Sequence, residues 1–316
     1  MRVLITGAAG ALGQVLVPIL VDDPRITELV LHDWRAIAND HPKLRILRGD
    51  IRDPALSHVV RGADAVVHMA FVVIESDLGR ERHNRALARA INLDGTKALV
   101  DALSPGARLV HLSSASVYGT SRTPVPESAP LKPLPGFHYA KDKVLAEKIV
   151  IAAEKEGLCA VRLRPHIILG PCAQPFLRAV LRLPFYPRLP PPAPPLQVVH
   201  EQDVAAAIHA ALFAQATGAI NLACEDSLSF EAMQRSLHRF VFGINPGLAR
   251  IAARSAFHYL GVGPDPAWSA GLDCPLVLDT TRAREELNVR LRFPHVADVL
   301  ADTFRRRPGR GALTRP

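Results

Sequence analysis

Residues 2–21 read RVLITGAAGALGQVLVPILV, and this stretch decides the fold. A short apolar run is followed by a glycine-rich loop and then by an apolar helical pattern. Small residues in such a loop let the backbone approach a pyrophosphate, and the helix N-terminus offers free N–H groups and its positive dipole end. The stretch therefore predicts the strand, turn and helix of a dinucleotide-binding fold. The loop positions expected to contact the phosphates are Gly7, Gly10, Ala11, Leu12 and Gly13.

A carboxylate follows the second apolar run. Glu28–His32 is expected as a strand, and Asp33 comes about 20 residues after Gly13. A carboxylate there accepts hydrogen bonds from the adenosine ribose hydroxyls and repels a 2′-phosphate. This favours NAD as the cofactor. Arg35 leaves NADP open, because its side chain can turn onto a 2′-phosphate.

Strand and helix patterns alternate through the first half of the chain. The runs are rich in Val, Leu and Ile, as is typical of strands covered on both faces. The alternation predicts an α/β fold with a doubly wound parallel sheet of the Rossmann type. Further strands are expected at 2–6, 44–48, 65–69, 109–113 and 160–163, and long helices at 12–21, 80–103 and 139–156.

The pattern changes after Arg164. The proline-rich run 183–196 cannot be a helix interior, and it predicts a rigid surface connection or the wall of a substrate cleft. A helix at 204–216, a strand at 219–222 and a helix at 230–242 are expected beyond it. We expect an NAD(P)-binding Rossmann domain over 1–165, completed by about 198–222. We expect a smaller mixed α/β substrate-binding region over 166–197 and 223–304, and a basic disordered tail over 305–316.

Composition excludes several classes of function. The net charge is +8, but arginines concentrate in the terminal stretch RRRPGRGALTRP and the body is close to neutral, so no nucleic-acid partner is expected. The four cysteines lie far apart without a CxxC pair, and no HxxxH or HExxH pattern occurs, so no disulfide framework and no metal are expected. No apolar run of about 18 residues and no signal-peptide pattern is present. We expect a cytoplasmic protein without a membrane partner.

A tyrosine and a lysine lie one helical turn apart in YAKDK, residues 139–143. A phenol with its usual pKa near 10 is a poor base at neutral pH. Lys143 on the same helix face is expected to lower the pKa of Tyr139, so that the phenol can exchange a proton with an alcohol or a ketone. Ser113, Ser114 and Ser116 follow an expected strand and are candidates for polarising the substrate oxygen.

With these motifs in order, the chain resembles the extended short-chain dehydrogenases/reductases of the NAD-dependent epimerase/dehydratase superfamily. The resemblance covers about residues 1–225. The matching blocks are TGAAGALG (6–13), HDWR (32–35), GDIRD (49–53), VVHMA (66–70), NLDGT (92–96), HLSSASVYG (111–119), YAKDK (139–143), RLRPHIILGP (162–171) and VHEQDVAAAI (199–208).

The resemblance assigns roles to single residues. It implies that Tyr139 is the acid/base, that Lys143 holds the ribose and tunes the phenol, and that Ser114 is the catalytic serine. It also implies further cofactor contacts around the adenine, along the nucleotide, near the nicotinamide ribose and beside the nicotinamide. These contacts are, in that order, Asp50 with Ile51, Met69 with Ala70, Asn92, and His166.

The chain departs from the superfamily pattern at two places. Sugar-nucleotide dehydratases carry an Asp-Glu pair where this chain has Ala115 and Ser116, so dehydration is not expected. Enzymes of UDP-sugars often carry an Asn where this chain has Ile167. The substitute phosphate contacts would be Arg178, Arg182 and Arg188, of which the first two are expected on one helix as a solvated face.

Three functions remain open at this point. The first is an NAD(P)-dependent oxidoreductase acting on a secondary alcohol or ketone, the second an NAD-retaining sugar-nucleotide epimerase, and the third a non-catalytic nucleotide-binding protein. Apolar residues near 71–74 and 176–186 favour a less charged small-molecule substrate than a nucleotide sugar. The resemblance also implies a homodimer formed through the two long helices at 80–103 and 139–156.

Overall fold

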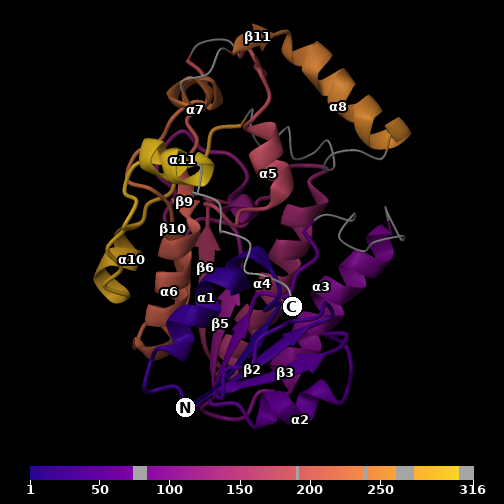
Figure 1. Ribbon diagram of the computed structural model, residues 1–316, viewed down its shortest axis with the longest axis vertical. Helices are drawn as coiled ribbons and strands as arrows, with labels where there is room; N and C mark the ends of the chain where they lie inside the picture. The colour runs from indigo at the N-terminus through magenta and orange to yellow at the C-terminus, as the bar shows by residue number, and fades with distance from the viewer. Residues whose placement is uncertain (74–83, 190–191, 238–240, 261–273, 306–316) are drawn as a thin grey trace, which may run out of the picture.

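A computed structural model describes residues 1–73, 84–189, 192–237, 241–260 and 274–305 (Figure 1). Within these residues a seven-stranded sheet has the order β10-β6-β5-β4-β1-β2-β3, and each neighbouring pair is parallel. The strands are β1 (Arg2–Thr6), β2 (Glu28–Asp33), β3 (Leu44–Arg48), β4 (Ala65–His68), β5 (Arg108–Leu112), β6 (Cys159–Pro165) and β10 (Gly218–Leu222). The predicted doubly wound parallel sheet is confirmed.

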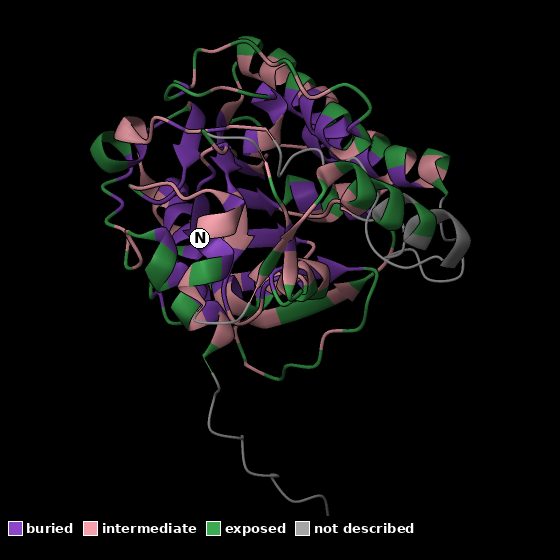
Figure 2. Ribbon diagram, turned by 90° about the horizontal axis from the view of Figure 1, so that it is seen from above, coloured by how far each residue is buried: buried purple, intermediate pink, exposed green. Residues whose placement is uncertain are grey.

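Helices cover both faces of this sheet, because successive residues of each strand point to opposite sides. Val3 and Ile5 pack toward α1 (Ala11–Val21) and α6 (Glu201–Phe213). Leu4, between them, packs with α2 (Leu56–Arg61), α3 (Arg85–Asp101) and α4 (His138–Lys155). Buried residues follow the strands and the inner helix faces (Figure 2).

Most of the remaining elements gather beyond the carboxyl ends of the strands (Figure 1), whereas residues 281–286 pack beside β10. Most of these elements share a second core that contains Leu169, Tyr186, Met233 and Val299. Two small parallel sheets, β7-β9 and β8-β11, belong to this part. The elements are η2 (Ala115–Tyr118), β7 (Ile167–Leu169), α5 (Pro175–Val180), β8 (Phe185–Pro187), β9 (Val198–His200), α7 (Phe230–Ser236), β11 (Phe242–Ile244), α8 (Pro246–Leu260), α10 (Thr281–Glu286) and α11 (Val296–Phe304).

Two expected elements differ from the structure. The helix expected at 230–242 ends at Ser236, and Phe242 begins β11 instead, because its N–H donates to Pro184 O and its ring lies against Phe185. The proline-rich run was expected as a surface connection or a cleft wall, and its C-terminal end is buried. Leu196 is 1% exposed and exchanges backbone hydrogen bonds with Leu228. The start of the helix expected at 80–103, two prolines of the run and the arginine tail from 306 lie outside the described residues.

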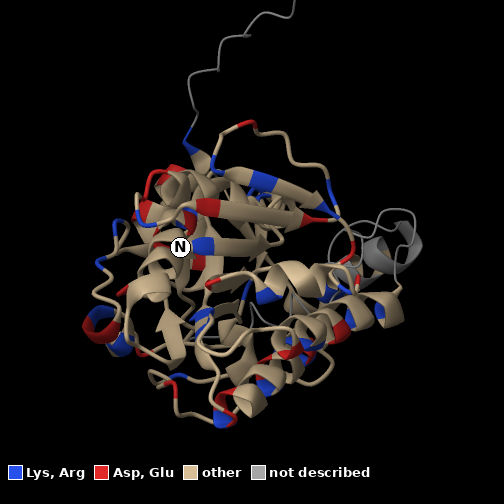
Figure 3. Cartoon of the chain, turned by 90° about the horizontal axis from the view of Figure 1, so that it is seen from below, with Lys and Arg blue, Asp and Glu red and all other residues tan. Residues whose placement is uncertain are grey.

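In the part of the chain that the structure describes, no helix is both long and apolar enough to cross a membrane. Lys and Arg segments interleave with Asp and Glu segments over the side drawn in Figure 3.

Candidate active site

One cavity of about 1340 Å³ runs from the glycine loop to the second core. It brings together nearly all the predicted site residues, although they come from seven separate segments of the chain. Asn92 is the exception, since it does not line the cavity. The predicted residues that line it are Gly7, Gly10, Ala11, Leu12, Gly13, Asp33, Arg35, Asp50, Ile51, Met69, Ala70, Ser114, Tyr139, Lys143 and His166.

The glycine loop is built for close backbone approach. Gly7 has φ +74°, and a Cβ there would come within 2.7 Å of Ala70 N. A Cβ on Gly13 would collide with the backbone of Ala8. Gly10 caps α1 without a side-chain hydrogen bond, so the first N–H groups of the helix remain available to an anion. These three positions fit a pyrophosphate on steric grounds.

Asp33 ends β2 and holds the loop in place. It is 4% exposed, and its carboxylate accepts from Ala9 N at 2.9 Å and from Arg35 N at 2.9 Å. The Arg35 guanidinium also pairs with it, with Nε 3.2 Å from Oδ1. The Arg35 guanidinium, which was expected to be able to contact the 2′-phosphate of NADP, is therefore paired with the Asp33 carboxylate, which favours NAD.

The wall next to Asp33 contains residues that the sequence reasoning missed. Asp50 pairs with Arg52 at 2.6 Å, and both line the cavity together with Trp34, which is 55% exposed. Ile51 packs against α3 at Gly95, where a Cβ would lie 2.5 Å from Ile51 Cγ2. Trp34 and Arg52 belong to the HDWR and GDIRD blocks. The sequence signal for them was therefore their position next to predicted cofactor contacts.

Ser114 and Tyr139 form the centre of the site. The Ser114 hydroxyl accepts from Ser116 Oγ at 2.9 Å and from Ser116 N at 3.2 Å. Its own proton therefore remains for the side-chain hydrogen bond that it makes with Tyr139. Ser113, in contrast, donates to Glu147 at 2.5 Å. The structure thus separates the three serine candidates and joins Ser114 to the phenol.

Burial has the largest influence on the pKa values of Tyr139 and Lys143. It raises the pKa of Tyr139 to about 12, and the hydrogen bond from Ser114 acts in the opposite direction. Burial lowers the pKa of Lys143 to about 7, while the charge of Glu147 opposes this change. Lys143 was expected to lower the pKa of the phenol. In this structure its Nζ donates to Leu112 O at 2.7 Å and lies 3.7 Å from the Phe71 ring centre, against 5.9 Å from that of Tyr139.

Asn92 lies beneath the cavity wall. Its Oδ1 accepts from Val72 N at 2.7 Å, and its Nδ2 donates to Val72 O at 3.2 Å. These bonds fix the segment after β4 that carries Phe71, so Asn92 positions the wall on which Lys143 rests. His166 lines the cavity with Nδ1 accepting from Ile167 N at 2.9 Å. Burial lowers its pKa to about 4, so the imidazole is neutral at pH 7.

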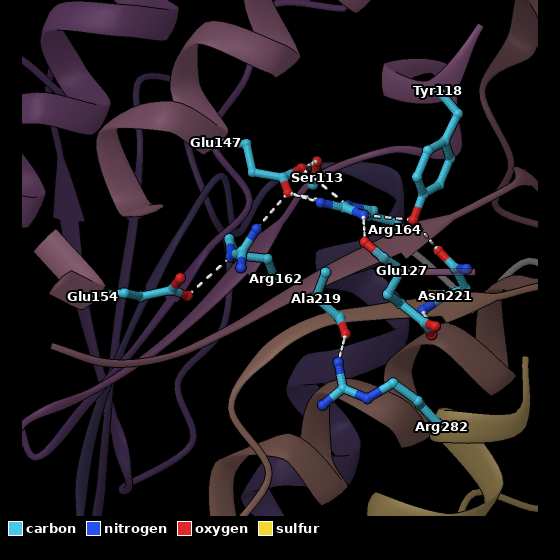
Figure 4. Close-up of polar contacts among 10 residues, drawn as sticks. All are labelled: Ser113, Tyr118, Glu127, Glu147, Glu154, Arg162, Arg164, Ala219, Asn221 and Arg282. Carbon is cyan, nitrogen blue, oxygen red and sulfur yellow. Dashed lines mark hydrogen bonds and ion pairs between the residues drawn. The ribbon is translucent and has the colours of Figure 1, made fainter. Parts of the chain in front are cut away.

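A buried ionic cluster anchors α4 behind the site (Figure 4). Glu147 is fully buried and accepts from Arg162 Nη1 at 2.7 Å and from Arg164. Arg164 also donates to Tyr118, whose hydroxyl donates to Asn221 Oδ1 at 2.8 Å. The sequence reasoning missed this cluster. The available signals were the spacing of Glu147 one turn after Lys143 and the alternation of the two arginines along β6.

The three arginines considered for phosphate contacts do not line the cavity. Arg178 Nη1 donates to Pro171 O at 2.8 Å, the Arg182 guanidinium lies 5.5 Å from the Phe304 ring centre, and Arg188 lies against Gly243. Because α5 ends at Val180, Arg178 and Arg182 do not share one helix as expected.

His200 was expected as a structural histidine, and its contacts agree. It is buried, its Nε2 lies 3.0 Å from Asp302 Oδ2, and its Nδ1 caps α6 by accepting from Gln202 N. Among the described residues no group of His, Cys, Asp and Glu is placed to hold a metal ion.

A parallel sheet of this order, with a glycine loop after its first strand and a cavity lined by Ser114, Tyr139 and Lys143, is the arrangement of a dinucleotide-binding enzyme. The family model described as "NAD dependent epimerase/dehydratase family" matches residues 3–183. The chain belongs to this family of NAD-dependent enzymes, and it is an enzyme of the extended short-chain dehydrogenase/reductase type.

Individual proteins resemble the chain over nearly its whole length. A Mycobacterium tuberculosis protein of uncharacterized function is 30% identical over 329 residues, which cover 98% of this chain and 84% of the relative. A ceramide reductase of Caulobacter vibrioides is 28% identical over 312 residues, covering 90% and 84%. The solved structure of MoeE5 in complex with UDP-glucose and NAD has a TM-score of 0.72 at 23% identity, covering 96% and 97%. This last likeness supports the fold.

Proposed function

We propose that the protein is an NAD-dependent oxidoreductase that interconverts a secondary alcohol and a ketone, with ketone reduction as the favoured direction. The observation that carries the proposal is the hydrogen-bonded pair of Ser114 and Tyr139 in the same cavity as the glycine loop. The residues that would hold NAD are the glycine loop, Asp33 and Lys143. When bound, NAD supplies or accepts the hydride.

The protein's own groups handle the substrate oxygen and its proton. Ser114 would donate a hydrogen bond to the oxygen, and Tyr139 would give its proton to a ketone or take one from an alcohol. Because burial raises the pKa of Tyr139 to about 12, the phenol is protonated at neutral pH and is suited to act as the acid. His166 is neutral and fixed by Ile167, which leaves the proton transfer to the tyrosine.

Several observations favour this reaction over the alternatives. Ala115 and Ser116 begin η2 and offer no carboxylic acid for a dehydratase. A nucleotide-sugar epimerase needs cations for the diphosphate, and the three arginines expected to supply them, Arg178, Arg182 and Arg188, do not line the cavity. The relative from Caulobacter vibrioides is named as a reductase.

The first test asks what the purified protein carries and what it turns over. Mass spectrometry after denaturation, without added nucleotide, would identify any retained cofactor. We expect a protein that exchanges NAD freely and oxidises NADH in the presence of ketones. Tyr139→Phe should lose at least about a hundredfold in kcat/KM, while Tyr186→Phe, whose hydroxyl donates to Glu231 outside the cavity, should keep activity. Stoichiometric retained NAD with no NADH oxidation would favour the epimerase.

We propose further that the expected domain boundaries hold, with a Rossmann domain over 1–165 completed by about 198–222 and a substrate-binding region over 166–197 and 223–304. We also propose that the protein acts on a small molecule in the cytoplasm and forms a homodimer. The helices α3 and α4 pack side by side on one face of the sheet, which supports them as the dimer surface. Light scattering coupled to size-exclusion chromatography would test the dimer, with Lys97→Glu as a probe of the exposed face of α3.

A further inference from the structure

Beyond Tyr139 the cavity continues into an arm between α5, β8, α7 and α8, which we call the apolar arm. Its walls begin at Ile167, directly after His166. They continue with Phe176, Leu177 and Val180 of α5, Phe185 of β8 and Met233 of α7. Because Ser114, Tyr139 and Ile167 line the same cavity, a substrate held by the two hydroxyls can extend into this arm without leaving the cavity.

The arm offers little to a charged or phosphorylated group. From Ile167 onward, the polar residues among the described lining are Gln174, Glu201 and Arg250. Glu201 is 3% exposed, and its two carboxylate oxygens accept from Cys172 N at 3.0 and 3.1 Å. Its carboxyl group supplies no cation for a diphosphate. Arg250 is an exposed residue of α8.

We propose that the apolar arm binds the hydrocarbon chain of a lipid-type ketone or alcohol, whose oxygen is held by Ser114 and Tyr139. This inference rests on the proposed function, and it adds the substrate class. Apolar surface removed from water drives such binding without directional contacts, so the arm selects for chain length. Each buried methylene strengthens binding by about fourfold, until the arm is filled.

The first experiment measures chain-length dependence with NADH and straight-chain methyl ketones, from butanone to pentadecan-2-one. The expected result is a kcat/KM that rises by about fourfold per methylene and then levels off, with most of the change in KM. A kcat/KM that is independent of chain length among ketones that are turned over would overturn the proposal.

A second experiment measures binding without turnover, so that the substrate class is tested apart from the reaction. The probe is the methyl ester of cis-parinaric acid, a neutral polyene that fluoresces when bound in an apolar site. Leu177→Glu places a charge in the arm and should weaken probe binding at least about tenfold. Leu248→Glu is the matched control, because Leu248 is 64% exposed on α8 and does not line the cavity. Thermal unfolding of both variants would show that they fold.

The outcomes separate the two proposals. Probe binding that persists in Tyr139→Phe and falls in Leu177→Glu supports the arm, even if no ketone is reduced and the proposed function fails. Absence of probe binding to the wild type, or equal binding to Leu177→Glu and Leu248→Glu, overturns the arm. Displacement of bound probe by UDP-glucose at micromolar concentration would also overturn it, because a nucleotide sugar would then occupy the same space.

Discussion

The hydroxyl of Ser114 receives two hydrogen bonds from Ser116 and gives its proton to the hydrogen bond with Tyr139. The two bonds from Ser116 occupy the acceptor side of the serine hydroxyl and leave its proton as the donor. When a ketone oxygen lies beside both hydroxyls, the serine proton would turn from the phenol to that oxygen, which would then meet two donors, because the phenol is also protonated at neutral pH. Under the proposed function, these two donors would stabilise the negative charge that the ketone oxygen gains during hydride transfer.

The first prediction concerns this serine. Ser114→Ala should lower kcat about a hundredfold or more, because one donor to the developing oxyanion is lost. Ser116→Ala is the control, since it removes a contact to Ser114 but no donor to the substrate, and it should cost much less. Steady-state kinetics of NADH oxidation would measure both. Equal losses in the two variants would contradict the role given to Ser114.

The second prediction concerns pH and Lys143. Its pKa is about 7 in the folded protein against 10.5 in the unfolded chain, so the unfolded chain binds more protons between these values. The free energy of unfolding contributed by this group therefore rises with pH across that window. Lys143→Met should stabilise the cofactor-free protein most at and below pH 7, and progressively less toward pH 10.5. Urea unfolding at several pH values would show this trend, and a constant difference would refute it.

The third prediction concerns the cofactor. Asp33→Ala removes the carboxylate that is expected to repel a 2′-phosphate and frees the Arg35 guanidinium paired with it. The NADPH/NADH ratio of kcat/KM should rise by about tenfold or more. Asp33→Ala combined with Arg35→Ala should lose most of this gain. An unchanged ratio in the single variant would place the selectivity elsewhere.

The fourth prediction concerns the buried cluster of Figure 4. Glu147→Gln leaves Arg162 and Arg164 without their shared carboxylate and should reduce the free energy of unfolding by about 3–5 kcal/mol. Glu154→Gln should cost less, because this carboxylate pairs with Arg162 alone and its side chain is 18% exposed. Denaturant unfolding of the two variants would compare them. A larger loss for Glu154→Gln would contradict the anchoring role of Glu147.

Local patterns in the sequence predicted most of the fold and most of the candidate residues that the structure brings together in one cavity. The glycine loop, Asp33 at the end of β2, and Tyr139 with Lys143 each depend on residues close together in the chain. The strands at 2–6 and 44–48 were predicted with their observed bounds. Periodicity and turn chemistry are enough at this range.

Contacts between distant segments were not predictable in the same way. The Asn92 side chain is held by the backbone of Val72. Phe242 belongs to a strand because it contacts Phe185. The Lys143 ammonium lies over the ring of Phe71. Neither the spacing of these residues in the sequence nor their charge indicates that they are in contact. Burial likewise set the pKa of Tyr139 against the expectation from Lys143, because desolvation depends on the surrounding fold rather than on the neighbouring residue.

The apolar arm and the catalytic centre come from different lengths of the chain. Ser114, Tyr139 and Lys143 all precede residue 166, whereas the arm is built from residues that follow it. Mutations that reshape the arm therefore leave the reacting groups and the glycine loop untouched. Proteins with this layout can evolve a new substrate specificity through changes in the later segments while the reaction stays the same. A protein engineer can graft those segments between relatives for the same purpose.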